Sequence, residues 1–374
     1  MLTGEKGILT QAQNAKNKTA EAEAKETEDL EEQNRLIEDL ANGNMILPSN
    51  DDTKPFLPEG ATVTNNDLNT GVTIRDANGN EWVWIEVPKS IYTNTEYNGG
   101  TAPTNSEDYG KIESVMQEYA KDYRQQLGYE DKWYSEAQHG FKTATDYDNH
   151  KNSMLKSVYD NGGFYVGKYE VGIKEDSYRT YGSDITIEHP TTGYTPVIQE
   201  DKYVYNWVTC KQAQELSKSL ATGGRTSSLM FGIQWDLVLK HIETKGAKKQ
   251  EELKVNSTNW GNYIGAQFEI AKGKYSEDYG KTYKTVSGTY SKRKNDEVLL
   301  TTGATNINST LNIYDLAGNV WEWTLEQYTS DSSNPCTICG GYYGTDDRNL
   351  TASIHYKNSV TYNNDVCGFR TVLW

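Results

Sequence analysis

The sequence predicts an α+β domain with few strands and long loops, preceded by an N-terminal helix. Three observations lead to this prediction. A hairpin pattern spans residues 71–88, helical patterns span residues 209–220 and 227–243, and Gly, Asn, Tyr and Thr dominate the chain from residue 259 onward. The first two patterns give strands and helices. The third is typical of long loops carried by few strands.

The N-terminal part has the composition of a charged helix. Residues 10–41 are rich in Ala, Glu, Gln and Lys and contain neither Gly nor Pro, which favours a helix. Its apolar residues are too few for the sustained heptads of a stable coiled coil; they are Leu30, Leu36, Ile37 and Leu40. We interpret residues 1–42 as a solvated helical stalk.

Clusters of Pro, Gly, Asn and Asp in residues 43–70 predict a linker with turns. The domain is expected to span residues 71–374. It opens with the hairpin, in which apolar residues alternate on both sides of a turn at residues 78–80; they are Val72, Ile74, Trp82, Trp84 and Val87. A helix is predicted over residues 107–127 and a strand over residues 162–172.

Charge and composition exclude several classes of partner. The net charge of −16 and the isoelectric point near 4.9 argue against nucleic acid and anionic membranes as partners, because both need a basic protein face.

The residue types also bear on the surface of the protein. The chain has 27 Tyr against 6 Phe, an excess that suits an exposed recognition surface. No stretch approaches the roughly 18 apolar residues of a membrane helix, so we expect the chain as given to be soluble.

Four motifs, taken in order, carry a family resemblance. The segment Asp315–Thr324 reads DLAGNVWEWT, and the other motifs are residues 163–171 (GFYVGKYEV), 339–343 (CGGYY) and 368–370 (GFR). Together they resemble the formylglycine-generating-enzyme (sulfatase-modifying factor) superfamily over roughly residues 160–374. The resemblance implies a C-type-lectin-like fold of the formylglycine-generating-enzyme type. Within it, Trp321 and Trp323 point to the same side of a strand and should anchor the core.

The resemblance also implies a Ca²⁺ site. It maps onto the side chains of Asp315 and Glu322 and the carbonyl groups of Gly318 and Val320. Two carboxylates supply only part of the about six to eight oxygens that Ca²⁺ takes. The alternative is a turn in which Asp315 accepts backbone N–H groups and Glu322 forms a buried pair with Arg370.

Catalysis in the family uses two cysteines as copper ligands, a soft thiolate site. Counted from Gly340 and Gly341, these positions fall on Thr345 and Leu350, which offer no sulfur. We therefore expect no enzyme and no copper. A rival hypothesis is an oxidase of the formylglycine type that uses relocated cysteines, Cys336 and Cys339.

The remaining cysteine chemistry stays open. A zinc site at the C-x-x-C of Cys336 and Cys339 would need a second ligand pair, and the five histidines show no matching spacing. In the lectin-like fold Cys339 and Cys367 could face each other as a disulfide, although pairing cannot be derived from sequence alone. Cys210, at a predicted helix start, is expected to be a buried small residue.

The tail has an unusual composition. Residues 342–366 contain no Glu, Gln, Met or Trp and a single Lys, Lys357. Codons that end in a pyrimidine exclude these five residue types, so the segment resembles the variable region of diversity-generating retroelement target proteins. The alternative is a polar loop that happens to be rich in Tyr. In residues 342–365 the candidate ligand contacts are Tyr342, Tyr343, Thr345, Asp346, Asp347, Asn349, His355, Tyr356, Lys357 and Asn358.

The first residues resemble a different group of proteins. The opening LTGEKGILTQAQNAKNKTAEAEAKE is similar to the segment that follows the membrane helix in prepilin-like proteins of Gram-positive gut bacteria. The resemblance implies that an N-terminal membrane anchor is missing here, and that this anchor is the protein's one link to a membrane. It also implies a bacterial or phage-encoded protein that lies at the cell surface or outside the cell. We expect it to bind a protein or glycan through a hypervariable face; the non-enzymatic alternative is a pilus-associated structural subunit.

Overall fold

The computed structural model describes residues 47–124, 127–179, 194–345 and 351–374. The predicted stalk and the prepilin-like segment lie outside these residues. Within the described ranges, no helix has both the length and the apolar character needed to cross a membrane. The description below concerns the unit Leu47–Trp374.

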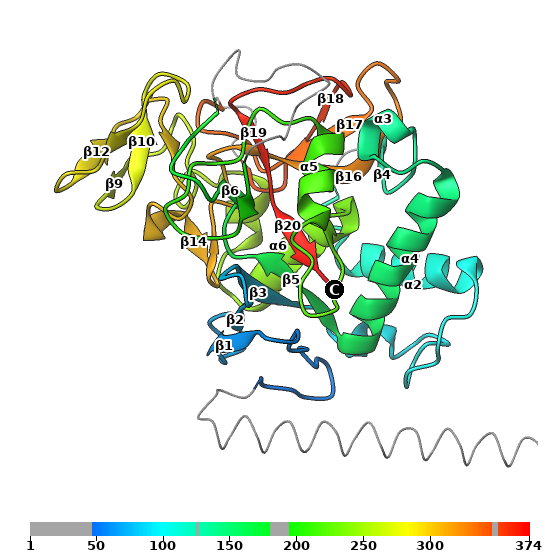
Figure 1. Cartoon of the computed structure of the whole chain (residues 1–374). Helices are drawn as coiled ribbons and strands as arrows, with labels where there is room; N and C mark the ends of the chain where they lie inside the picture. Colours follow the sequence, from blue (N-terminus) through cyan, green and yellow to red (C-terminus); the bar gives the residue numbers. More distant parts are fainter. Residues whose placement is uncertain (1–46, 125–126, 180–193, 346–350) are drawn as a thin grey trace, which may run out of the picture. The chain divides into compact units, whose positions relative to one another are not determined.

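Two sheets organise this unit, and the first joins its beginning to its end (Figure 1). Its six strands are antiparallel to their neighbours in the order β1-β2-β3-β5-β20-β8. The last strand of the chain, β20, therefore lies inside the sheet. The strands are β1 (Thr62–Asn65), β2 (Thr73–Arg75), β3 (Glu81–Glu86), β5 (Gly163–Gly167), β8 (Ser227–Leu229) and β20 (Thr371–Leu373).

The predicted hairpin is confirmed as β2 and β3, with Ile74 opposite Trp82. Its turn is held by Asp76, whose Oδ1 accepts the N–H groups of Asn78 and Asn80, both at 2.9 Å. Gly79 has a φ of 82°, which a residue without Cβ adopts at little cost.

The predicted linker is wrong for residues 47–70, because this segment packs on the domain. It supplies β1, and Phe56 belongs to the main core beside Trp84 and Tyr165, at ring-centroid distances of 5.6 and 5.2 Å. Trp84 Nε1 donates to Thr53 Oγ1 at 2.8 Å. Pro and Gly indicate turns, but they do not show whether the apolar residues between them are buried.

The second sheet carries strands from three of the four family motifs, whereas the motif at residues 163–171 supplies β5 of the first sheet. Its order is β18-β17-β16-β19, with β4 also paired to β16. Strand β16 runs parallel to β19 and antiparallel to β17, so it separates these two strands. The strands are β4 (Tyr129–Glu130), β16 (Trp321–Tyr328), β17 (Cys336–Cys339), β18 (His355–Asn358) and β19 (Cys367–Phe369).

Helices pack against both sheets. Helix α5 begins after Thr209, at the start of the predicted helical pattern 209–220, and Thr209 forms a capping box with Gln212. The helix predicted over 107–127 ends at Tyr119, and the one predicted over 227–243 is β8 followed by a shorter helix. The elements are α2 (Ser106–Tyr119), α3 (Glu136–His139), α4 (Ala144–Asn161), α5 (Cys210–Lys218), α6 (Gly232–Thr244), α7 (Gln250–Lys254), η1 (Lys89–Tyr92) and η2 (Asn306–Asn308).

Short strands and loops fill the rest, which confirms the predicted α+β class with long loops. A projecting arm around β9, β10 and β12 appears in yellow in Figure 1. The arm has a small core of its own that includes Phe268, Ile270 and Leu300. The short strands are β6 (Gly172–Ile173), β7 (Pro196–Val197), β9 (Phe268–Ile270), β10 (Lys274–Ser276), β11 (Lys284–Thr285), β12 (Tyr290–Lys292), β13 (Leu299–Leu300), β14 (Ser309–Thr310) and β15 (Ile313–Tyr314).

Candidate functional site

Three aromatic side chains form a row on one face of the second sheet. The Trp321 ring on β16 lies 6.0 Å from the Tyr356 ring on β18, nearly parallel to it, and 6.4 Å from the Tyr342 ring. Tyr356 is 49% exposed, Tyr342 is half-buried, and Trp321 is 7% exposed beneath them. We call Tyr342, Trp321 and Tyr356 the aromatic row. It presents amphipathic rings on a strand scaffold.

Four of the predicted contact residues retain exposed surface. Besides Tyr342 and Tyr356, these are Lys357 and Asn358, both half-buried on β18. Side chains alternate along a strand, so Asn358 shares the face of Tyr356, whereas Lys357 points to the other side. There Lys357 Nζ lies 2.7 Å from Asp331 Oδ2 and 5.1 Å from the centre of the Tyr328 ring.

Three predicted contact residues are buried, so their assignment to the exposed face is wrong. Tyr343 is 0% exposed, and Thr345 and His355 are each 4% exposed. The Oγ1 of Thr345 accepts the Tyr342 N–H at 2.8 Å, which fixes the turn that carries Tyr342. His355 alternates with Tyr356 on β18 and therefore faces inward.

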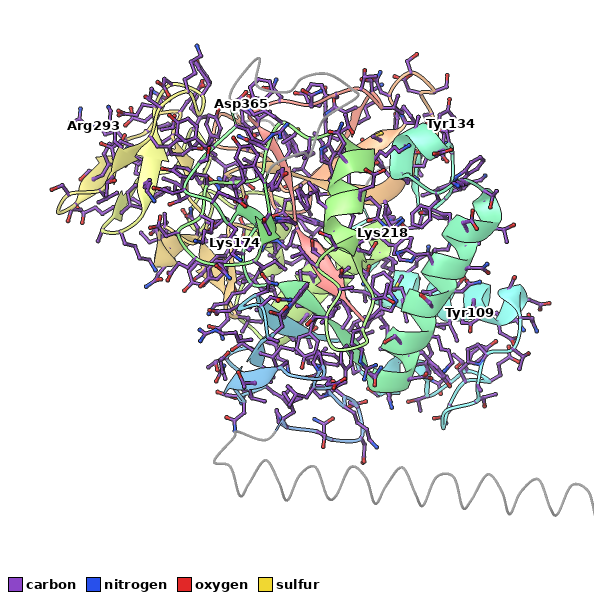
Figure 2. The ribbon with its side chains drawn as sticks, viewed as in Figure 1. Tyr109, Tyr134, Lys174, Lys218, Arg293 and Asp365 are labelled. Carbon is purple, nitrogen blue, oxygen red and sulfur yellow. The ribbon has the colours of Figure 1, made fainter. Side chains whose placement is uncertain are left out.

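Tyr343 donates its hydroxyl to the Asp365 carboxylate. The two residues thus tie the start of the predicted variable segment to its end. Figure 2 shows Asp365 at the end of the domain where Figure 1 places β18 and β19. The predicted contacts Asp346, Asp347 and Asn349 lie outside the described residues.

Sequence reasoning assigned Trp321 only to the core. The contact between its ring and that of Tyr356 depends on the β16–β17–β18 register, which a single sequence does not display. Trp323 is the buried anchor that was predicted, since it is 0% exposed and its Nε1 donates to the Val208 carbonyl at 2.9 Å.

A buried charge centre lies at the same end of β16, where Glu322 directly follows Trp321. The Arg370 guanidinium donates from Nε to both carboxylate oxygens of Glu322 at 3.0 Å, and from Nη2 to Oε1 at 2.7 Å. Two more carboxylates are buried nearby. Asp315 Oδ2 accepts the Gly303 N–H at 2.8 Å, and Glu170 Oε2 accepts from Asn319 Nδ2 at 2.7 Å.

Glu322 and Arg370 form the buried pair that the sequence predicted as the alternative to a calcium site. In this arrangement the predicted ligands are not all free to bind a Ca²⁺ ion. Both Glu322 oxygens already receive hydrogen bonds from Arg370, which supplies the positive charge. Among the described atoms, the Oδ1 of Asp315 has no partner in hydrogen-bond geometry, although the Asn308 side chain interacts with this carboxylate, so one predicted ligand atom is available. Calcium binding at Asp315, Glu322, Gly318 and Val320 stays a prediction.

Burial dominates the electrostatics of this centre. It raises the pKa of Asp315 to about 6 and the pKa of Glu322 to about 6, against the opposing effect of Arg370. Burial, together with the nearby Asp315 carboxylate, raises the pKa of Glu170 well above its ordinary value. Glu170 was missed by sequence reasoning. The signal available was an acidic residue in the family motif at residues 163–171, between Tyr169 and Val171.

The four cysteines are free and buried, so the Cys339–Cys367 disulfide is wrong. The two strands that carry them flank β16 on opposite sides. Two strand spacings of about 4.8 Å exceed the roughly 7 Å that a disulfide can span between Cα atoms. Cys210 is buried, as predicted, with its Sγ 3.4 Å from the Thr324 carbonyl oxygen.

The C-x-x-C does not bring its two thiols together. Cys336 and Cys339 are three residues apart on β17, and side chains at that spacing point to opposite faces of a strand. Cys336 interacts with Cys210, whereas Cys339 lies opposite His355. At the family's copper positions, Thr345 is part of the turn described above, and Leu350 lies outside the described residues.

Two sheets joined by the Glu322–Arg370 pair, with the last strand beside β5, define a C-type-lectin-like domain. Residues 160–373 match the family model of the sulfatase-modifying factor enzyme 1-like domain, and the chain belongs to this family. The match contains the four motifs recognised in the sequence. No curated protein matches the chain.

The solved structures similar to this chain include CarF and Treponema denticola variable protein 1. CarF shows 21% identity, with 39% of this chain covered and a TM-score of 0.25. The chain spans less than half of CarF, 46% of its length. Treponema denticola variable protein 1 shows 11% identity, with 88% of this chain and 97% of that chain covered and a TM-score of 0.22.

Proposed function

We propose that the domain is a non-enzymatic ligand-binding module whose contact face is varied between copies of the gene. The observation that carries this proposal is the aromatic row, where Tyr356 and Tyr342 stand over Trp321 within the segment of unusual composition. Rigid Tyr side chains supply contact area at low entropic cost, as in antibody loops. The ligand is a protein or a glycan, since Tyr and Asn suit both.

The contrast between exposed and buried residues supports the same proposal. Tyr356 and Asn358 occupy the outer face of β18, whereas Tyr343 and Asp365 hold the segment in place. Varying the outer residues would alter the contact surface and leave the hydrogen bonds of the base intact. The amino-acid composition of residues 342–366 is what variation of codons that end in a pyrimidine would leave behind.

The binding test uses the intact protein on a glycan array and in a pull-down against bacterial surface proteins. Tyr356→Ala is expected to remove the captured signal, because truncating a central aromatic contact typically costs about 2 kcal/mol or more. Tyr134→Ala is the matched control, as Tyr134 is 37% exposed and its hydroxyl donates to the Ser332 carbonyl, outside the aromatic row. A signal that survives Tyr356→Ala, or is lost equally in both variants, counts against this face.

The diversification claim has its own genomic test. A nearby repeat that differs from the coding sequence of residues 342–366 only at adenines, beside a reverse transcriptase gene, is expected. Without such a repeat the variation part of the proposal fails, and the binding part is judged by the array alone.

The absence of catalysis is also part of the proposal. It is supported by Thr345 in the turn and by the opposite orientations of Cys336 and Cys339. Copper loading followed by assay on a Cys-containing peptide is expected to show no turnover. Turnover that disappears in Cys336→Ala would establish the oxidase instead.

We further propose display at a bacterial cell surface or outside the cell, on the prepilin-like character of the first residues. Fractionation of the native host with an antibody to the domain tests this. Recovery only in the cytoplasmic fraction would contradict it.

A further inference from the structure

A second cluster of polar side chains lies beneath β18, on the face opposite the aromatic row. It consists of Glu326, Cys339 and His355, whose candidate ligand atoms all lie within 4.8 Å of one another. The Cys339 Sγ is 3.5 Å from His355 Nδ1, and that nitrogen is 2.7 Å from Glu326 Oε2. None of the three side chains is more than 4% exposed.

The sheet register brings these residues together. Cys339 on β17 pairs directly with His355 on β18, so both side chains project from the same face. The β16–β17 register is irregular between Thr324 and Gln327, and Glu326 lies in that irregular stretch. The three residues are 13 and 16 positions apart along the chain; no local motif therefore marks them.

A second layer of residues contacts the cluster from α6 and from the segment before β4. Asp236 Oδ1 lies 3.5 Å from His355 Nε2, on the side of the ring away from Cys339. Arg124 contacts Asp236 at 2.7 Å and Glu326 Oε1 at 3.1 Å. Metal-bound histidines characteristically direct their second nitrogen at a carboxylate, which orients the ring.

The charge count of this region is unbalanced. With a protonated thiol, three carboxylates face the Arg124 guanidinium and the His355 imidazole, which leaves a net charge of −1 when the imidazole is protonated and −2 when it is neutral; the carboxylates belong to Asp131, Asp236 and Glu326. Uncompensated buried charge is costly. Among the described atoms, Glu326 Oε1, Asp236 Oδ1 and His355 Nε2 also lack a partner in hydrogen-bond geometry. A divalent cation would offset the charge.

We propose that Glu326 Oε2, Cys339 Sγ and His355 Nδ1 bind a Zn²⁺ ion. Thiolate, imidazole and carboxylate together are a donor set that zinc accepts. Ligands about 2.0–2.3 Å from a tetrahedral zinc lie roughly 3.4–3.6 Å apart, which matches the sulfur–nitrogen distance. The nitrogen–oxygen distance must lengthen by about 0.7 Å, a shift that a turn of the Glu326 side chain supplies.

A surface cavity lies next to the residues that surround the cluster. A cavity of about 850 Å³ is lined by Arg124, Tyr129 and Asp131 among others. Arg124 contacts Glu326, and the Tyr129 ring lies 5.5 Å from the His355 ring. The proposed ion would tie β18 to β16 and β17, and the inference does not depend on the proposed ligand-binding function.

The test begins with chelator-treated full-length protein, first confirmed to be folded by circular dichroism. Cobalt(II) is added as a spectroscopic probe and is then displaced by zinc. We expect one equivalent of Co²⁺, an absorption band from a cobalt–thiolate bond, and loss of that band after one equivalent of Zn²⁺.

Variants locate the site. Cys339→Ala is expected to abolish the cobalt–thiolate band, whereas Cys367→Ala, at another buried free cysteine, should retain it. Asp236→Asn should keep the band and lower the zinc affinity by about 10–100-fold, the usual effect of a carboxylate behind a histidine ligand. If folded wild-type protein gives no band, or the band persists in Cys339→Ala, the proposal is overturned.

Discussion

Glu322 and Arg370 form a fully buried bidentate pair that connects the Trp motif on β16 to the chain between β19 and β20. Arg370 also donates to the Gly167 carbonyl at 2.9 Å and to the Tyr314 carbonyl at 2.7 Å. A single guanidinium thus contacts both sheets. The contact between Glu322 and Arg370 therefore gives a structural reason for the Glu in the motif DLAGNVWEWT and for the Arg in the motif GFR.

Breaking the pair is expected to be strongly destabilising. Glu322→Gln should lower the free energy of unfolding by about 3–5 kcal/mol, because it leaves the Arg370 charge buried without its carboxylate. The measurement is equilibrium unfolding in denaturant. The double variant Glu322→Leu, Arg370→Met removes both charges and should lose less than Arg370→Met alone. A double variant less stable than Arg370→Met alone would contradict this explanation.

Calcium binding is tested by calorimetric and thermal-shift titration of chelator-treated protein. An ion at Asp315 and Glu322 would compete with Arg370 for the Glu322 oxygens. We therefore expect weak binding, with a dissociation constant in about the 10⁻⁴–10⁻³ M range of weak extracellular calcium sites. Asp315→Asn should abolish it. If wild-type protein shows neither heat nor a thermal shift in millimolar calcium, the calcium hypothesis is wrong.

Acid should destabilise the domain through its buried histidines. Burial lowers the pKa of His241 from 6.5 to about 3, and its Nδ1 accepts the Glu86 N–H at 3.1 Å. Between pH 6.5 and pH 3 the unfolded chain therefore binds more protons than the folded chain. The contribution of neutral His241 to the free energy of unfolding is fully present above about pH 6.5. It is lost as the pH falls toward 3, by a few kcal/mol at roughly 1.4 kcal/mol per pKa unit.

The matched variant is His241→Asn, which keeps an acceptor near the Glu86 N–H but does not titrate in this range. Its unfolding free energy, measured from pH 7 to pH 4, should fall less steeply than that of the wild type. Equal slopes in the two proteins would exclude His241 as a source of the acid sensitivity.

The two kinds of Tyr in the tail should behave differently. Tyr343→Phe leaves the buried Asp365 carboxylate without the hydroxyl that donates to it, at an expected cost of about 1–3 kcal/mol of stability. Tyr356→Ala on the exposed face should change stability by less than about 0.5 kcal/mol. Thermal unfolding of both variants checks this, and a reversed order would mean that Tyr356 supports the fold.

Local patterns in the sequence predicted the hairpin, β5, the start of α5 and the α+β class, because each depends on neighbouring residues. Helix α4 was missed, although its Thr143–Asp146 capping box and the buried Tyr147, Leu155 and Val158 were available signals. The composition of the tail located its Tyr-rich segment. Its inward and outward residues could not be separated without the register of β18, and the Glu326–Cys339–His355 cluster joins three separate strands.

The turn that precedes β16 should depend on Gly318. This residue has a φ of +77°, and a Cβ added there would lie 2.2 Å from the Asn262 carbonyl oxygen. Gly318→Ala therefore combines an unfavourable backbone conformation with a clash against main chain that cannot rotate away. We expect it to lower the free energy of unfolding by about 2–3 kcal/mol or more, measured in denaturant.

Gly110→Ala is the control for that substitution. Gly110 lies within α2, and a Cβ there would meet nothing within 4 Å. Replacing a helical Gly by Ala should stabilise the protein by about 0.5–1 kcal/mol. The two substitutions add the same methyl group, so opposite signs isolate the effect of the turn. A Gly318→Ala variant as stable as the wild type would mean that the turn can move away from Asn262.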